Sequence, residues 1–76
     1  MDKPEALAEG VAQDVVGFLI EDEGLSVPQA LDRFYGSEVA QRVFDHETGL
    51  YREGAAYVYG LLRDELAHGR IVQLEV

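Results

Sequence analysis

Cysteine is absent from this 76-residue chain. Without cysteine the chain can form no disulfide, no thiolate zinc site and no cysteine nucleophile. The composition therefore fits a reducing compartment and excludes the small domains that disulfides hold together. A domain of this length buries only about 60% of the surface that its unfolded chain exposes. The core is expected to be thin, so association with a partner or a second copy would help to stabilise it.

Basic side chains are scarce. Six lysines and arginines stand against 15 aspartates and glutamates, and the net charge is −9. Nucleic acids bind proteins through basic side chains that contact phosphates, so we expect no direct nucleic-acid binding. An acidic surface favours a basic partner and speeds its arrival through long-range attraction. The same charge also serves simple solubility, which requires no partner.

Long apolar runs are missing as well. No stretch approaches the roughly 20 consecutive apolar residues that a helix needs to span a bilayer. The N-terminal sequence Met-Asp-Lys-Pro-Glu lacks the basic and apolar regions of a signal peptide. We therefore expect a cytoplasmic protein with no membrane partner.

Helical periodicity, in contrast, is present along most of the chain. Apolar residues recur at spacings of three and four positions, which is the pattern of helices with one buried face. The sequence predicts a mostly α fold, a compact bundle of about four short helices in a single domain over residues 1–76. The predicted helices cover residues 4–23, 27–35, 38–44 and 54–68.

Serine residues mark two of the predicted helix starts. Ser26 precedes the second helix, and Gln29 follows it at the spacing of a capping box. Ser37 precedes the third helix in the same way. Gly24 is expected to end the first helix in a left-handed conformation. These residues are explained by helix capping and do not indicate catalysis.

Apolar residues of every predicted helix are expected to face inward. Thr48 and Gly49 mark a turn in the main loop, and the following Leu50 and Tyr51 are expected to anchor it to the core. The helical positions that we expect on the inner faces include Leu7, Val15, Leu19, Leu31, Phe34, Tyr35, Val43, Phe44, Val58, Leu61, Leu62 and Leu66.

The last seven residues have a different pattern, because apolar and polar residues alternate from Val72 to Val76. This alternation is typical of a β-strand. A single strand is not stable alone, so residues 70–76 are expected either to pack as an extended tail or to pair with another chain as a strand.

Candidate catalytic or metal-binding groups are few. Asp45, His46 and Glu47 are adjacent oxygen and nitrogen donors, and His68 is distant in sequence. A metal site needs several ligands that converge on one point, which consecutive loop residues rarely do. We therefore predict no enzymatic activity, no metal and no cofactor. A minor enzyme or metal binder that uses His46 and His68 stays as a third alternative.

Several sequence blocks resemble a known family. The block 24–35, Gly-Leu-Ser-Val-Pro-Gln-Ala-Leu-Asp-Arg-Phe-Tyr, is similar to the opening of a family of small acidic bacterial proteins of unknown function. Thr48-Gly49, Tyr57-Val58 and Asp64-Glu65-Leu66 resemble its second half, so the resemblance spans about Asp14 to Leu66. Such proteins are often encoded beside toxin-like genes and labelled antitoxins. The resemblance implies an antitoxin-like protein without catalytic residues.

The first functional hypothesis is a non-enzymatic acidic protein-binding module, the antitoxin-like partner of a basic protein. Acidic residues would steer the partner and an apolar patch would supply affinity. The alternative is a structural homodimer of unknown role, in which the first helix or the tail pairs across a two-fold axis. The expected partner-binding residues are Glu21, Asp22, Glu23, Ile71, Val72, Leu74 and Val76.

Overall fold

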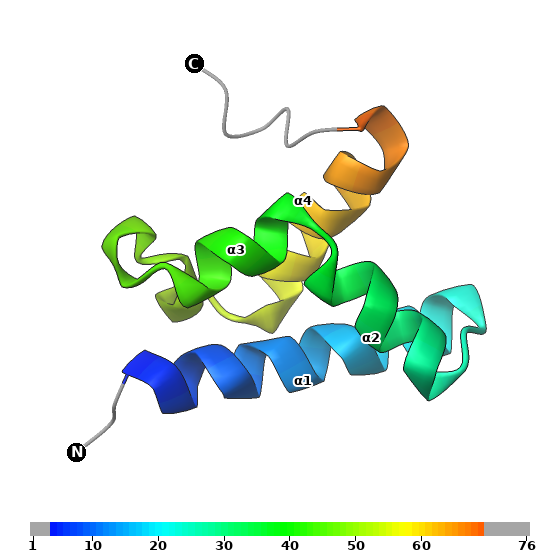
Figure 1. Ribbon diagram of the computed structural model, residues 1–76, viewed down its shortest axis with the longest axis horizontal. Coiled ribbons are helices and arrows are strands. Elements are labelled where there is room, and N and C mark those ends of the chain that lie inside the picture. Colours follow the sequence, from blue (N-terminus) through cyan, green and yellow to red (C-terminus); the bar gives the residue numbers. More distant parts are fainter. Residues whose placement is uncertain (1–3, 70–76) are drawn as a thin grey trace.

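The structure, a computed structural model, describes residues 4–69 and confirms the mostly helical fold (Figure 1). Within this range no residue belongs to a β-strand. The expected strand or extended tail over residues 70–76 lies outside the described residues. The elements, in chain order, are α1 (Pro4–Glu23), α2 (Val27–Tyr35), α3 (Glu38–Phe44), the 3-10 turns η1 (His46–Thr48) and η2 (Leu50–Arg52), and α4 (Ala55–His68).

The predicted helix boundaries agree with the structure almost everywhere. The first three helices begin and end at the predicted residues, and α4 begins at Ala55 with Gly54 as its N-cap. Ser26 and Gln29 form the predicted capping box: the Ser26 N–H donates to Gln29 Oε1 (3.0 Å), and the Gln29 N–H donates to Ser26 Oγ (3.3 Å). Gly24 has the predicted left-handed conformation, with φ of 67°.

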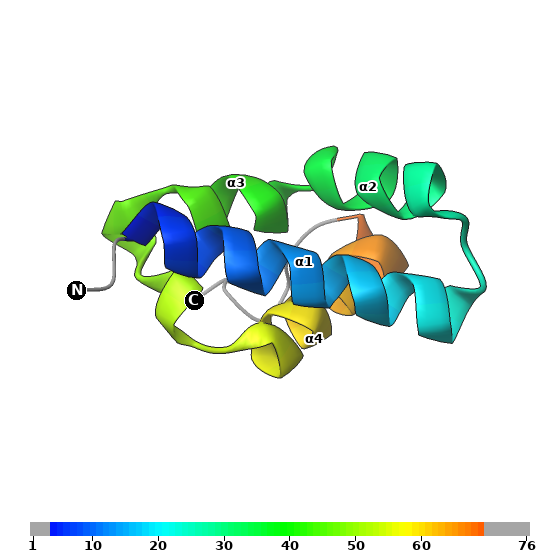
Figure 2. The same cartoon turned by 90° about the horizontal axis from the view of Figure 1, so that it is seen from below.

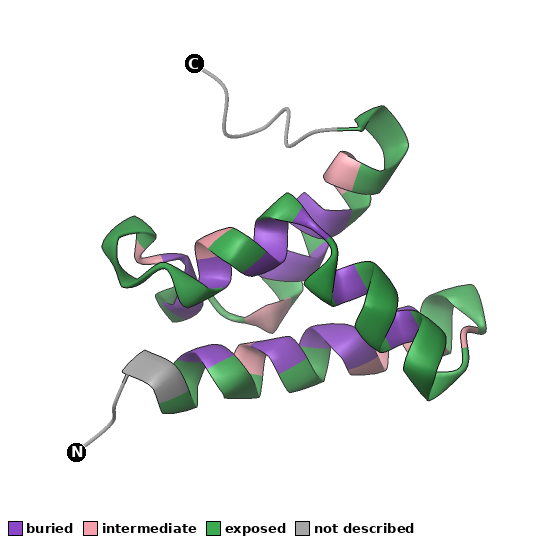
Figure 3. Ribbon diagram, viewed as in Figure 1, coloured by how far each residue is buried: buried purple, intermediate pink, exposed green. Residues whose placement is uncertain are grey.

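Helix α1 is the element around which the others pack. Figure 1 shows α1 along one edge of the molecule, with α2, α3 and α4 all on the same side of it. Figure 2, seen from below, shows α2 following α3 in one row, with α4 beside that row. Helix α1 contacts all three of the other helices, and α3 also contacts α4. The buried side of α1 faces these helices (Figure 3) and carries small residues such as Ala8 and Ala12, which allow close approach.

The core lies between α1 and the other three helices. Its largest completely buried side chains come from all four helices and are aliphatic except for one phenylalanine. Burial of side chains of this size contributes about 1.5–3 kcal/mol each, so these residues dominate the stability of the fold. They are Phe34, Leu19, Leu61, Leu62, Val15, Val39, Val43 and Val58.

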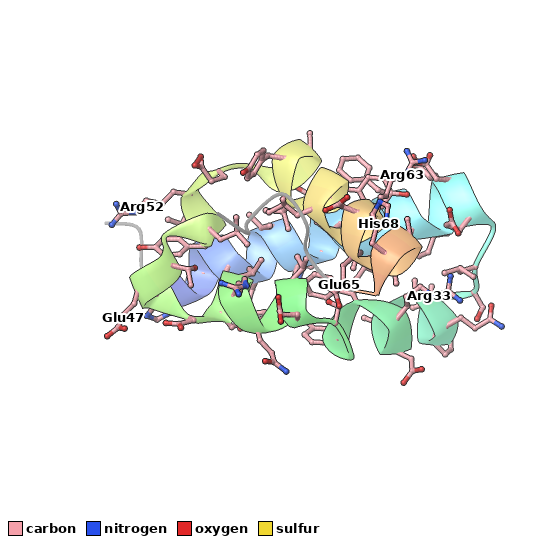
Figure 4. All side chains as sticks on the ribbon, turned by 90° about the horizontal axis from the view of Figure 1, so that it is seen from above. Arg33, Glu47, Arg52, Arg63, Glu65 and His68 are labelled. Atoms are coloured by element: carbon pink, nitrogen blue, oxygen red, sulfur yellow. The ribbon has the colours of Figure 1, made fainter. Side chains whose placement is uncertain are left out.

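The start of α3 is capped from two directions. Ser37 Oγ accepts a hydrogen bond from the Ala40 N–H (3.1 Å), as the sequence predicted. The carboxylate of Glu65, on α4, accepts two more, from the N–H groups of Glu38 (2.9 Å) and Val39 (3.0 Å). Figure 4 shows Glu65 pointing from α4 toward the helices that run past it. Since unpaired N–H groups at a helix start need acceptors, Glu65 joins α4 to α3.

The loop between α3 and α4 folds as two consecutive 3-10 turns. The Thr48 hydroxyl lies within hydrogen-bond distance of the carbonyl oxygens of Arg42 (2.6 Å) and Asp45 (2.9 Å), and its oxygen accepts from the Leu50 N–H (3.1 Å). Gly49 follows with φ of 67°. Leu50 and Tyr51 are each only 6% exposed, which confirms them as the predicted anchors of the loop.

Four leucine and phenylalanine positions that were expected to face inward are exposed instead, and Tyr35 is exposed with them. Leu7, Leu31, Phe44 and Leu66 have exposed fractions of 37–45%, and Tyr35 reaches 54%. Helical spacing gives the direction of an apolar face, but burial also requires a neighbouring element to cover it. Only one edge of the broad apolar face of α2 is covered, at Ala30 and Phe34, so the prediction was wrong for its other edge.

Candidate functional site

Within residues 4–69, the most extended group of exposed apolar side chains lies on α2 and the end of α3. Val27, Leu31 and Tyr35 are spaced by four residues along α2, so they line up on one side of that helix. The Phe44 ring stacks on the Tyr35 ring, with ring centroids 6.0 Å apart and an interplanar angle of 20°. We call these four residues the apolar stripe.

The aromatic end of the apolar stripe is held in place by the core. Tyr35 packs edge-on against Phe34, with ring centroids 5.0 Å apart, and Phe34 is completely buried. The Tyr35 ring therefore contacts a fixed core residue and the exposed Phe44 ring. Exposed aromatic side chains on a rigid support are typical of binding hot spots, because little conformational entropy is lost when they are covered.

Each arginine among residues 4–69 contacts an acidic or aromatic side chain. Arg33 pairs with Glu23 (3.8 Å) and Arg42 with Glu38 (3.4 Å). The Arg52 guanidinium lies 5.4 Å from the Tyr51 ring centroid, and the Arg63 guanidinium 5.9 Å from that of Tyr59. The surface thus keeps an excess of carboxylates without an ion-pair partner in this range, among them Glu9, Asp14, Glu21, Asp32, Glu47 and Glu53.

The predicted acidic contact residues, Glu21, Asp22 and Glu23, are all exposed at the end of α1. The three carboxylates have different neighbours. Glu23 pairs with Arg33, and Asp22 lies near the Tyr59 hydroxyl. Glu21 lines a hollow on the outer side of α1. The other predicted contacts, Ile71, Val72, Leu74 and Val76, lie outside the described residues.

Among the residues that the structure describes, Tyr59 is the titratable residue whose pKa its surroundings clearly shift. Its side chain is 8% exposed, and its hydroxyl forms no hydrogen bond of standard geometry with residues 4–69. Burial raises the pKa of Tyr59 above 10.0, and the Asp22 carboxylate raises that pKa further, against a smaller lowering by Arg63. A phenol that keeps its proton more firmly is a poor base near neutral pH.

The two histidines lie in separate surroundings. His46 packs edge-on against Tyr51 (centroids 5.7 Å apart), and His68 Nε2 lies 3.6 Å from Asp64 Oδ1. Figure 4 shows Glu47, which follows His46 in the chain, at one end of the molecule and away from His68. Across residues 4–69, no group of three or more His, Cys, Asp or Glu side chains is arranged to hold a metal ion. The structure does not bring the candidate donors together.

Sequence reasoning missed the apolar stripe as a candidate site. The signal was present, because Val27, Leu31 and Tyr35 widen the apolar face of α2 beyond the width that Ala30 and Phe34 alone would give. A nine-residue helix with such a wide apolar face buries only part of it. The additional apolar residues of α2 were interpreted as part of the core.

None of the helices within residues 4–69 combines the length and the hydropathy that crossing a membrane requires. Comparison of the chain with models of protein families, with curated proteins and with solved structures finds no match. The resemblance to antitoxin-like proteins therefore stays a prediction.

Proposed function

We propose that this protein is a non-enzymatic acidic module that binds a basic protein in the cytoplasm, in the manner of an antitoxin. The observation that carries the proposal is the apolar stripe, in which Val27, Leu31, Tyr35 and Phe44 have exposed fractions of 56%, 40%, 54% and 37%. Exposed apolar residues are common singly, but a contiguous group that includes two stacked aromatic rings marks an interaction surface.

The net charge favours a basic partner over a second copy. Each chain carries a net charge of −9, so two copies repel one another at long range. A basic protein is attracted by the same field, which raises its rate of association. The apolar stripe would then supply affinity, since apolar and aromatic anchors at the centre of an interface carry most of its binding energy.

The test is affinity capture of the tagged full-length protein expressed in its native cells. We expect the wild type to retain one basic protein in stoichiometric amount. The double variant Leu31→Ser/Tyr35→Ser should lose it, because loss of two central anchors weakens binding by a factor of about 100 or more. Tyr57→Ser is the matched control, since Tyr57 is a similarly exposed tyrosine (47%) on α4, outside the stripe.

Two outcomes would overturn the proposal. Capture of the same proteins by the wild type and the double variant would show that the stripe is not the binding surface. The second outcome comes from light scattering. The wild type and Tyr57→Ser would have twice the mass of the 8.4 kDa chain, whereas the double variant would have the mass of a single chain. This result would support the homodimer alternative. Circular dichroism of each variant controls for loss of the fold.

A further inference from the structure

A shallow hollow of about 270 Å³ lies on the outer side of α1. It is lined by Gln13, Asp14, Gly17, Phe18 and Glu21, which belong to three successive turns of that helix. These residues lie largely opposite the positions that α1 buries, such as Ala12, Val15 and Leu19. We call this feature the α1 hollow.

Gly17 lies in the middle of the α1 hollow, and neither the backbone nor the packing requires glycine there. Its φ angle is not positive, and a Cβ added to it would meet no atom within 4 Å. Glycine is the least favourable residue in the interior of a helix after proline. Its presence is therefore unexplained by stability, and its effect is to leave space between the side chains around it.

The lining of the α1 hollow fits an organic cation. Asp14 and Glu21 are seven positions apart, so they lie on the same side of the helix on either side of Gly17. Neither carboxylate has an ion-pair partner among residues 4–69. Phe18 supplies an aromatic wall, and its ring packs against Tyr59 with centroids 5.3 Å apart, which holds it in position.

An arginine side chain is the ligand that these groups recognise best. Its guanidinium is planar, donates hydrogen bonds to carboxylates and stacks on aromatic rings. A lysine ammonium could bind the same carboxylates but would keep more of its hydration. A neutral group would form no ion pair with the carboxylates, and an anionic group would be repelled by them.

We propose that the α1 hollow is a binding site for an arginine side chain of the basic partner. The inference rests on the proposed function for the source of that arginine. The site itself does not depend on the apolar stripe, because the two surfaces share no residue. Together they would give the partner an apolar anchor on α2 and α3 and a charged anchor on α1.

The test is a titration of the 15N-labelled full-length protein with N-acetyl-arginine N-methylamide, followed by NMR. The matched neutral probe is the citrulline derivative, which has the same shape without the charge. We expect saturable shifts of the amides of Gly17 and Phe18 with the arginine probe and none with the citrulline probe. Equal shifts with both probes, or no saturable shift with either, would overturn the proposal.

Variants test whether the saturable NMR shifts arise from binding in the α1 hollow. Gly17→Leu should abolish the saturable shifts by filling the space, whereas Gly10→Leu, on the same exposed side of α1 and also without contacts at its Cβ, should leave them unchanged. Asp14→Asn and Glu21→Gln should each weaken binding about two- to fivefold. Glu9→Gln should have no effect. Binding that survives in Gly17→Leu would contradict the proposal.

The outcomes separate this site from the proposed function. If the arginine probe binds but native cells yield no partner that depends on the stripe, the α1 hollow stands and the proposed function fails. If a stripe-dependent partner is captured but the probe does not bind, the proposed function stands and the α1 hollow fails.

Discussion

At the scale of single residues, Tyr59 contains two opposing contributions to stability. Its ring is buried against Phe18 and lies under the Arg63 guanidinium, 5.9 Å from the ring centroid, and this burial stabilises the fold. Its hydroxyl is also buried but lacks a hydrogen bond of standard geometry within residues 4–69. A buried, unsatisfied polar group costs about 1–3 kcal/mol, so the hydroxyl offsets part of what the ring contributes.

Removal of this hydroxyl is therefore expected to preserve or increase stability. Tyr59→Phe should leave the free energy of unfolding unchanged or raise it by up to about 2 kcal/mol, because the ring stays and the unsatisfied group is lost. Urea denaturation at neutral pH measures the difference. Tyr57→Phe, at an exposed position, should change stability by less than about 0.5 kcal/mol. Clear destabilisation by Tyr59→Phe would mean that the hydroxyl has a stabilising partner.

The raised pKa of Tyr59 predicts a loss of stability at alkaline pH. Burial first, and the Asp22 carboxylate second, raise this pKa above 10.0, so the folded state holds the phenol proton more tightly than the unfolded state. The contribution of this group is complete below pH 10.0 and is lost as the pH rises through the higher folded pKa. Urea denaturation between about pH 8 and pH 11 should show a steeper decline for the wild type than for Tyr59→Phe. Parallel declines would refute the assignment.

At the scale of secondary-structure elements, Glu65 provides the best-defined tertiary hydrogen bonds. Its carboxylate caps two N–H groups of α3 from α4. We expect Glu65→Ala to lower the free energy of unfolding by about 1–2 kcal/mol, because two charge-assisted hydrogen bonds are lost. Glu65→Gln should fall between, since an amide has one acceptor oxygen. Chemical denaturation is the measurement, and Glu9→Ala, which removes the same charge from an exposed position of α1, is the control.

Two glycines separate the effect of backbone conformation from that of packing. A Cβ added at Gly24 or at Gly60 would meet no atom within 4 Å. Gly24 has φ of 67°, whereas Gly60 lies inside α4 without a positive φ. Gly24→Ala should therefore destabilise the fold by about 1 kcal/mol, and Gly60→Ala should stabilise it by up to about 1 kcal/mol. Thermal or urea denaturation of both variants tests the difference in sign, and equal effects would contradict it.

Local sequence patterns predicted the helix caps but not the hydrogen bonds between helices. Ser26 and Ser37 cap helices through bonds to residues three positions away, so a local pattern was enough to predict them. The bonds from Glu65 to Glu38 and Val39 span 27 and 26 positions. No local pattern signals such a contact, because it depends on how α4 crosses α3.

The candidate site was less predictable than the fold. Periodicity placed Leu31, Tyr35 and Phe44 on apolar faces, but it could not show that no described element covers them. Gly17 was not singled out in the sequence at all, because a glycine that leaves a hollow resembles one that merely weakens a helix. Both surfaces exist because no neighbouring element within residues 4–69 covers them. Which element covers a residue is decided only when the helices pack together.

At the scale of the whole molecule, repulsion among the excess negative charges lowers the stability that burial of the small core provides. The net charge is −9, and each arginine within residues 4–69 contacts an acidic or aromatic side chain. The ion pair between Arg33 and Glu23 is exposed, and exposed pairs contribute only about 0–1 kcal/mol. The remaining carboxylates repel one another more strongly when the chain is compact than when it is unfolded. A bound basic protein would reduce this repulsion among the carboxylates of the folded chain.

Salt should therefore stabilise the isolated protein. An increase in NaCl from about 10 mM to about 150 mM shortens the Debye length from about 30 Å to about 8 Å and screens the net repulsion. A gain of about 1 kcal/mol would raise the melting temperature by about 4–8 °C for a domain of this size. Thermal denaturation in NaCl and in KCl at matched ionic strength measures the shift, and agreement between the two salts excludes specific binding of one cation. If the melting temperature falls instead, local ion pairs outweigh the net repulsion, and a basic partner would relieve no net repulsion within the folded chain.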